Sequence, residues 1–212
     1  MREINIGKND AGQRLDRFVS KSLPLLPPAL LQKYIRLKRI KVNGKGAKRD
    51  TRLAAGDTLQ LYINDEFFDK PSEENMFLTL FRPQLDIVYE DDNLLLVNKR
   101  LGLVVHADET EKVNTLINHI QAYLYQKKEW NPKWENAFAP ALCNRIDRNT
   151  GGIVIAAKNA ETLRILNEKI RAHEVEKSYL CVTVGRPSPA KGKIEGFLLK
   201  DEAKKQVSFH TR

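Results

Sequence analysis

One carboxylate between two arginines is the arrangement in this sequence best suited to chemistry. Asp147 lies within residues 143–152, flanked by Arg145 and Arg148. Arginine keeps its charge in proteins, and an opposite charge nearby keeps a carboxylate ionised even where burial would protonate it. An ionised aspartate beside phosphate-binding guanidinium groups suits catalysis on a nucleotide. The alternative is an ordinary ion-pair cluster on a surface turn, and these residues alone leave it open.

Two strands and a tight loop are expected to position Asp147. Residues 153–155 form a β-branched run typical of a strand buried on both faces. Gly151 and Gly152, directly before that run, accept backbone angles that other residues resist. A helix is expected at residues 160–171, with Asn159 as its cap. Its inward side chains are expected to be those of Leu163, Leu166 and Ile170.

The loop resembles the signature of the RluA-like family of RNA pseudouridine synthases, in which His-Arg-Leu-Asp-Arg-Asp/Glu-Thr-Ser-Gly precedes an apolar strand and Ala-Lys. The matching residues are Arg145, Asp147, Arg148, Thr150, Gly152, Ala157 and Lys158. The departures are Asn144 for His, Ile146 for Leu, Asn149 for the acidic residue and Gly151 for Ser. The resemblance implies that Asp147 is the catalytic residue and that Arg145, Arg148 and Thr150 bind substrate.

Two further segments extend the resemblance. Residues 98–106 are similar to the family motif Asn-Lys-Pro-x-Gly followed by an apolar strand and His, with Arg100 in place of Pro. We assign no catalytic role to His106. Residues 176–182 are expected to form a strand, whose alternation would place Lys177 and Tyr179 on one face. The pair resembles the family's Lys-x-Tyr motif, which implies that both bind substrate and that Tyr179 stacks on the target uracil.

The resemblance also leads us to expect a C-terminally truncated chain. Family members continue to a Gly-Arg-x-His-Gln-type motif, whose basic residue pairs with the catalytic aspartate, and no such motif occurs in these 212 residues. From this we expect that residues 1–212 bind structured RNA yet form no detectable pseudouridine.

Positive charge is concentrated in the first third of the chain. The net charge is +9, and residues 1–65 hold 14 Lys or Arg against 6 Asp or Glu. Within residues 33–52 nine basic residues face the single acid Asp50. A solvated lysine-rich face is the alternative, but such a bias favours contact with a polyanion.

The same third is expected to contain two helices and short strands. Apolar residues recur at helical spacing from Leu15 to a stop at Pro24, and a second helix is expected to begin at Pro27 and Pro28. Residues 40–42 lead into the turn Asn43-Gly44, which is typical of a hairpin, and residues 58–63 alternate as a strand.

This third resembles the ribosomal-protein S-four-like RNA-binding domain, which commonly precedes an RluA-like catalytic domain. The resemblance lies in residues 14–16 (Arg-Leu-Asp), 42–44 (Val-Asn-Gly) and 56–57 (Gly-Asp). The residues expected to contact RNA are Arg14, Lys33, Arg36, Lys38, Arg39, Lys41 and Lys45.

The expected fold class is α+β, in three parts. Residues 1–65 are a small helix-strand RNA-binding domain, 66–84 a linker, and 85–212 an incomplete mixed, mainly antiparallel sheet catalytic domain with flanking helices. In the linker, Phe67, Phe68, Met76 and Phe77 are expected to anchor the chain. The catalytic part should open with strands at 87–90 and 94–97, followed by a helix capped by Asn114. Trp130 and Trp134 are expected to pack, and further strands are expected at 193–196 and 207–209.

Composition excludes several classes of protein. No apolar run approaches the ~20 residues that span a bilayer, and the start of the sequence lacks the apolar segment of a signal peptide, so we expect a cytoplasmic protein. Cys143 and Cys181 are isolated, which argues against a disulfide framework or a zinc site. We expect no metal, no cofactor and a monomer.

The sequence therefore predicts an RNA pseudouridine synthase, an isomerase acting on specific uridines, with ribosomal RNA as the expected substrate. The leading alternative is a non-catalytic RNA-binding protein with the same domain order. A metal-dependent nucleotide hydrolase is disfavoured, because no cluster of carboxylates or histidines surrounds the loop and no Gly-rich phosphate motif is present.

Overall fold

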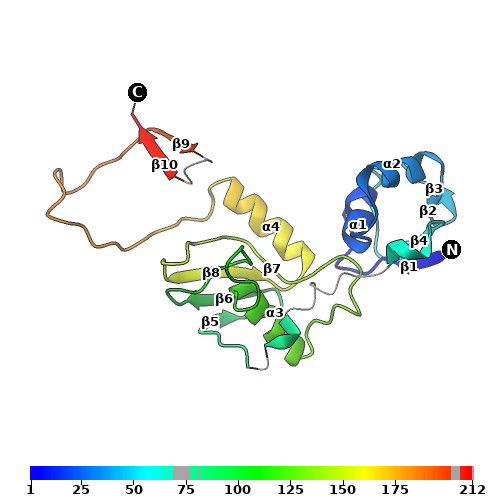
Figure 1. Cartoon of the computed structure of the whole chain (residues 1–212), viewed down its shortest axis with the longest axis horizontal. Helices are drawn as coiled ribbons and strands as arrows, with labels where there is room; N and C mark the ends of the chain where they lie inside the picture. The colour runs from blue at the N-terminus through cyan, green and yellow to red at the C-terminus, as the bar shows by residue number, and fades with distance from the viewer. Residues whose placement is uncertain (69–76, 81, 202–205, 212) are drawn as a thin grey trace. The chain divides into compact units, whose positions relative to one another are not determined.

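The computed structural model describes residues 1–68, 77–80, 82–201 and 206–211. It contains two compact units, Met1–Val175 and Glu176–Arg212, each described by itself below. Helices and sheets alternate along the chain (Figure 1), and every named strand pair is antiparallel. A fold of mixed helices and antiparallel sheets is thereby confirmed.

The first unit opens with a four-stranded sheet packed against two helices. The elements are β1 (Arg2–Asn5), α1 (Leu15–Ser22), α2 (Pro28–Arg36), β2 (Ile40–Val42), β3 (Lys45–Gly46) and β4 (Thr58–Leu61). The strand order is β1-β4-β2-β3. Phe18, Leu31 and Ile40 belong to its buried core. Both helices and the hairpin match the sequence prediction, whereas β1 was not predicted and β4 ends at Leu61, two residues before the predicted end.

Two of the short motifs from the sequence contact each other in this sheet. Asn43 and Gly44 have φ of 51° and 78°, as a tight hairpin turn between right-twisted strands requires. The Asn43 side chain donates to Asp57 Oδ1 at 2.8 Å and accepts from the backbone N–H of Thr58 at 2.8 Å. The Asn-Gly turn is thereby fastened to the start of β4.

A second four-stranded sheet follows, with one face covered by a helix. Its elements are β5 (Ile87–Glu90), β6 (Leu94–Lys99), α3 (Leu116–Gln126), β7 (Ala141–Leu142) and β8 (Gly152–Ala157), with strand order β5-β6-β8-β7. Ile120 of α3 packs in one buried cluster with Val97 and Val154. Ile153 points away from this cluster and is 45% exposed, so the predicted burial of β8 on both faces is wrong.

The helix caps agree with the sequence at one helix and differ at the other. Asn159 caps α4 (Ala160–Arg171) by accepting a hydrogen bond from the N–H of Thr162 at 2.9 Å, as predicted. Thr115, not Asn114, caps α3, and its hydroxyl accepts from the N–H of Asn118 at 3.3 Å. Asn114 contacts the His119 ring instead. The side chains predicted to face inward on α4 are only partly buried: Leu163, Leu166 and Ile170.

The aromatic residues of the predicted linker are divided between the two cores. Phe67 and Phe68, in a short 3-10 turn, pack against the first core. Phe77 is buried in the second core, where its ring centroid lies 5.1 Å from that of Trp130. Met76 lies outside the described residues. Trp134 is 69% exposed, so its predicted packing role is wrong. The boundaries at 65 and 85 stay a prediction.

The second unit contains one described hairpin, formed by β9 (Phe197–Asp201) and β10 (Gln206–His210). The strand predicted at 207–209 lies within β10, but residues 193–196 precede β9 and are not a strand. The strand predicted at 176–182 is also absent. Its apolar side chains are open to solvent, with Tyr179 at 62% and Val182 at 103% exposure. Alternation alone does not make a strand, because the backbone also requires a hydrogen-bonded neighbour.

Charged side chains connect the end of β5, the end of α3 and the residue after β8. Glu90 accepts hydrogen bonds from Tyr123 Oη at 2.7 Å, Lys127 Nζ at 2.8 Å and Lys158 Nζ at 3.0 Å. Burial disfavours the charged form of Glu90, but these three hydrogen bonds outweigh it and lower its pKa to about 2. Lys158, which matches the family pattern, therefore has a structural role.

We expect Glu90→Gln to destabilise the second core near neutral pH. A carboxyl whose pKa is about 4.3 unfolded and about 2 folded adds stability above pH 4.3, and this stability is lost as pH falls toward 2. The loss at pH 7 should be about 2–3 kcal/mol and should shrink at pH 3. Urea unfolding followed by tryptophan fluorescence measures both values. Glu174→Gln, which breaks the exposed pair with Lys169, is the control. An equal loss of stability at both pH values would contradict the proposal that this stability comes from the ionised Glu90 carboxylate.

Candidate active site

Asp147 lies on the exposed loop between β7 and β8. The preceding side chain, Ile146, is partly buried and packs against the second core, which anchors the loop to that core. The N–H of Thr150 donates to the backbone oxygen of Asp147 at 3.0 Å and closes a turn. The loop therefore presents the Asp147 carboxylate to solvent from a fixed backbone.

The two neighbouring arginines do not pair with Asp147. The Arg148 guanidinium donates to Thr110 Oγ1 at 2.9 Å and lies 3.4 Å from Asp108 Oδ2, so it holds residues 108–110 against the loop. Within the described part of the chain, Asp147 forms no ion pair. The ion-pair cluster that was the alternative interpretation of this loop is therefore not formed by Asp147. Because the Asp147 carboxylate is exposed, water can solvate its charge without the arginines.

Arg145 acts on the opposite side of the loop. Its side chain is exposed, and its charge acts on His106. Protein atoms around the His106 ring and the positive charge of Arg145 both lower the pKa of His106. Among the described residues Arg145 forms no ion pair, so its guanidinium is available to an anionic ligand.

The buried ammonium group of Lys99 ties the catalytic loop to β6. Leu95, Val97 and Lys99 alternate on the buried face of this strand, and Lys99 is only 1% exposed. Its Nζ donates to the backbone oxygens of Arg100 at 3.1 Å, Leu103 at 2.8 Å and Arg148 at 3.1 Å. Burial lowers the pKa of Lys99, and the negative charge of Asp147 acts in the opposite direction.

Lys99 is the site residue that sequence reasoning missed. In the sequence it stood out only as a match to a short motif, without a role. The available signal was the position of Lys99, which follows Leu95 and Val97 on the inward face of an alternating strand. Lysine is almost never fully buried unless its donors are satisfied, so this position indicates a buried ammonium group with several acceptors. The structure shows those donors satisfied by backbone oxygens that include the carbonyl directly after Asp147.

Asn144, which stands where the family pattern has His, joins the loop to β8. Its Nδ2 donates to the oxygen of Ile153 at 3.2 Å, and its Oδ1 accepts from the N–H of Ile155 at 2.8 Å. The side-chain amide thereby forms with β8 the two hydrogen bonds that one residue of a neighbouring strand would form. This departure has a structural consequence, since it prolongs the pairing of β8 beyond β7.

Gly152 meets a backbone requirement at the other end of the loop. Its φ is 132°, within the region that side chains rarely adopt, so the glycine expected on sequence grounds is needed there. A Cβ at Gly151 would lie 3.4 Å from the backbone oxygen of Lys99. Both glycines allow β8 to begin close against β6.

The two predicted substrate residues of the second unit are described within that unit alone. Lys177 and Tyr179 lie in exposed chain without strand structure. They belong to Glu176–Arg212, whereas Asp147 belongs to Met1–Val175. Their assignment to the uracil site stays a prediction.

The predicted RNA-binding residues form an unneutralised basic surface on the first core. Among the described residues, no acid forms an ion pair with any of Lys33, Arg36, Lys38, Arg39, Lys41 and Lys45. We call these six the basic surface. Arg14 differs from them, because its guanidinium donates to both carboxylate oxygens of Asp16, at 3.1 and 2.6 Å. That contact lowers the pKa of Asp16 and orients Arg14 toward α1.

The described residues provide neither a cluster of metal ligands nor a membrane-spanning helix. They contain no group of three or more His, Cys, Asp or Glu side chains placed to hold a metal ion. None of the helices described is long and apolar enough to cross a bilayer.

Comparison with known proteins now assigns the chain to a family. A sequence profile described as RNA pseudouridylate synthase matches residues 93–212, more than half of the chain, and the match includes the Asp147 loop and Lys99. The chain belongs to the RNA pseudouridylate synthase family. Membership in this family confirms the main resemblance drawn from the loop motif.

Individual relatives of this synthase family agree. An uncharacterized RNA pseudouridine synthase of Mycoplasma capricolum subsp. capricolum is 32% identical over 86% of this chain and 59% of that protein. The ribosomal large subunit pseudouridine synthase C of Vibrio vulnificus is 31% identical over 94% of this chain and 60% of that protein. The chain thus spans less than two thirds of the length of these relatives.

Among solved structures, that of human RNA pseudouridylate synthase domain containing 4 is 23% identical, with a TM-score of 0.44, and covers 66% of this chain and 52% of that chain.

Proposed function

We propose that this protein isomerises uridine within RNA to pseudouridine and that Asp147 is its carboxylate catalyst. The observation that carries the proposal is the family match across the loop, in which the exposed Asp147 is the residue that the family motif assigns to catalysis. The proposal favours the enzyme over the non-catalytic RNA-binding alternative.

The reaction requires a nucleophile or charge and a flipped-out base, but no cofactor. The bond between uracil N1 and ribose C1′ breaks, the base turns, and a bond forms between C5 and C1′. The C5 proton passes to solvent and N1 takes up a proton, so substrate and product have the same atoms. Attack by Asp147 on the sugar or on the base would divide this difficult step into two easier ones. The target uridine must leave its stack, which requires the exposed setting that Asp147 has.

The finer parts of the proposal concern the substrate and its binding. Residues 1–65 would act as an S-four-like RNA-binding domain, supported by the basic surface and by the contact between Asn43 and Asp57. Ribosomal RNA is the proposed substrate, because relatives such as that of Vibrio vulnificus are named as ribosomal large subunit synthases. Lys177 and Tyr179 would contact the target uridine, and the protein would act in the cytoplasm as a monomer.

Release of tritium from RNA labelled at uracil C5 tests the activity. Because C5 loses its hydrogen when the new bond forms, each pseudouridine made releases one label into water. The protein expressed from its intact gene should release tritium from ribosomal RNA of the source cell, and mapping should then locate the modified sites. Absence of both label release and pseudouridine would reject the enzymatic proposal.

RNA binding by the basic surface is tested separately. Replacing Lys33, Arg36, Lys38 and Arg39 together with Gln should weaken RNA binding and flatten its salt dependence, by about one unit of slope for each phosphate that is no longer neutralised. Stability should change by less than about 0.5 kcal/mol per site, because these side chains are exposed. Filter binding between about 50 and 200 mM salt gives the slope.

A matched variant controls for total charge. Replacing Lys112, Lys128, Lys133 and Arg171, which are exposed and lie outside residues 1–65, removes the same four charges. This control should leave the slope nearer that of the unmodified protein. A slope unaffected by the first variant would reject the basic surface as the RNA contact.

A further inference from the structure

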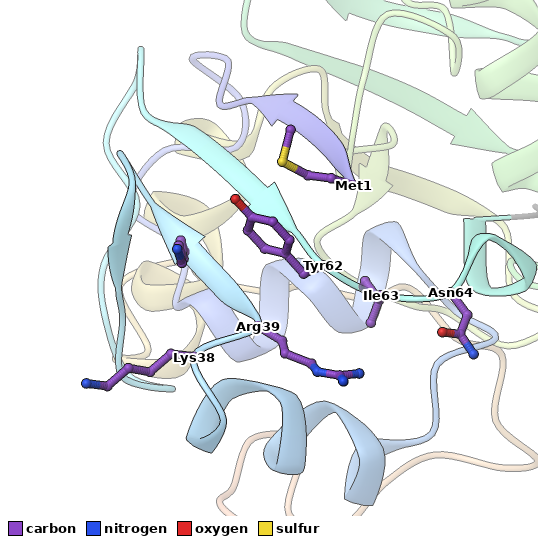
Figure 2. Close-up of a pocket in the computed structure, with 7 residues that line it drawn as sticks. Met1, Lys38, Arg39, Tyr62, Ile63 and Asn64 are labelled. Atoms are coloured by element: carbon purple, nitrogen blue, oxygen red, sulfur yellow. The ribbon is translucent and has the colours of Figure 1, made fainter.

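A cavity of about 560 Å³ opens where the basic surface meets the end of β4. Lys38 and Arg39 line it from the chain that joins α2 to β2, and Lys41 lines it from β2 itself. Tyr62 and Asn64 line it from the chain after β4. Figure 2 shows the Tyr62 ring within this hollow, with the side chain of Met1 on one side and that of Arg39 on another. The cavity lies within the common size range of small-ligand sites.

Tyr62 is held by its backbone while its ring stays accessible. The Tyr62 N–H donates to the backbone oxygen of Arg39 at 2.8 Å, which fixes the aromatic residue beside the basic segment. The side chain is nevertheless exposed, at 41% for the residue. The Lys41 ammonium lies 5.1 Å from the ring centroid, over the face of the aromatic system. Lys41 therefore covers this face with a flexible side chain, which a planar group can displace.

The surrounding cations are placed by the fold. Lys38 has a φ of 56°, and its aliphatic stem passes over Gly46, where a Cβ would lie 3.0 Å from Lys38 Cγ. The Arg39 guanidinium lies 5.4 Å from the centroid of Tyr34. Neither these two nor Lys41 forms an ion pair with an acid among the described residues. Lys38, Arg39 and Lys41 therefore line the same cavity as the Tyr62 ring, and Lys41 is the one that contacts its face.

We propose that this cavity binds a single unstacked nucleotide of RNA, with its base on Tyr62 and its flanking phosphates on Lys38, Arg39 and Lys41. Aromatic rings with adjacent cations are how proteins hold single-stranded nucleic acid, because every base has a π-face and every nucleotide has a phosphate. The base takes the position over the ring that Lys41 occupies, and the flexible Lys41 side chain moves to the phosphate. Asn64 at the rim offers an amide to the base edge.

This inference rests on the proposed RNA binding by residues 1–65 and adds a base-dependent contact to it. The first domain would then recognise an unpaired nucleotide in addition to a charged backbone. Contact with a loop or bulge, rather than with duplex alone, would follow, because bases within a helix are stacked and unavailable.

Binding of two RNA probes of equal charge tests the cavity. The first is an oligouridylate of about ten nucleotides and the second an oligomer of the same length with abasic sites throughout. Tyr62→Ala should weaken binding of the oligouridylate about tenfold and leave binding of the abasic oligomer unchanged, because stacking on one ring contributes about 1–3 kcal/mol per base. Tyr62→Phe keeps the aromatic face and should bind as the unmodified protein does.

The controls separate this inference from the proposed function. Tyr89→Ala removes a tyrosine of similar exposure from β5 and should not change binding of either probe. If Tyr62→Ala binds the oligouridylate as well as the unmodified protein does, or loses affinity for both probes equally, the nucleotide site is rejected. The basic surface then still stands if its salt slope falls as expected. If the unmodified protein binds neither probe, both the site and RNA binding by residues 1–65 are rejected.

Discussion

Asp147→Asn should abolish pseudouridine formation while RNA binding stays close to that of the unmodified protein. The amide preserves the size and shape of the side chain but removes both the charge and the nucleophilic oxygen. Because the Asp147 side chain is exposed and forms no ion pair within the described part of the chain, the substitution leaves no buried group unpaired. The loss should therefore appear in the rate of the chemical step and not in folding or affinity.

The measurement is tritium release under single-turnover conditions, together with RNA affinity in the same buffer. Asp92→Asn, at an exposed position in the turn between β5 and β6, is the matched control and should be fully active. Activity of Asp147→Asn near that of the unmodified protein would remove Asp147 from the catalytic role. Equal loss of activity and affinity would instead indicate that the loop binds RNA without reacting.

Lys99→Met should destabilise the second core and reduce catalysis together. The substitution keeps an apolar stem of similar length but leaves the oxygens of Arg100 and Leu103 without the donor they have now. Buried acceptors without partners cost about 1–3 kcal/mol each. Removing the buried ammonium group offsets part of this cost, so we expect the free energy of unfolding to fall by about 2–4 kcal/mol. Arg148 keeps one donor to its oxygen, the N–H of Gly102 at 2.9 Å.

Catalysis should fall because the oxygen of Arg148, the residue after Asp147, loses its Lys99 donor and keeps the Gly102 N–H, so the loop is held less firmly. Displacement of a catalytic group by about 1 Å can cost about 100-fold in rate. Urea unfolding followed by tryptophan fluorescence gives the stability, and Trp130 reports directly because it lies in the same buried core. Lys112→Met, at an exposed position, should change stability by less than about 0.5 kcal/mol. A stable and fully active Lys99→Met would show that the three hydrogen bonds do not position the loop.

The parts of the fold that sequence predicted best are those in which local chemistry and tertiary packing agree. The Asn43-Gly44 hairpin and the Asn159 cap depend on contacts within a few residues, so their signals are local. The strand predicted around Tyr179 failed because a strand depends on a neighbouring strand, which a short alternating pattern cannot reveal. The same limit applies to Ile153, whose exposure depends on what covers the second face of the sheet.

The sequence indicated the loop that carries Asp147 but not the contacts that hold this loop; the catalytic role of Asp147 stays a prediction. The motif around Asp147 identified the loop, whereas charge alone suggested pairing with Arg145 and Arg148 that the structure does not show. Arg148 contacts Asp108 and Thr110, which are some forty residues earlier in the sequence, so no local pattern could indicate the contact. The role of Lys99 likewise depends on three backbone oxygens brought together only by folding.

The way the Asp147 loop is fastened has a consequence for how such proteins diversify. The Lys99 ammonium and the Gly102 N–H, which both bind the Arg148 oxygen, hold the loop together with the partly buried Ile146. Within the described part of the chain, the exposed side chains at 145 and 149 form no hydrogen bond or ion pair that holds it. If the proposed function holds, we expect substitutions at those two positions to change which RNA is recognised while the backbone that carries Asp147 stays in place. New substrate preferences would then arise by single substitutions.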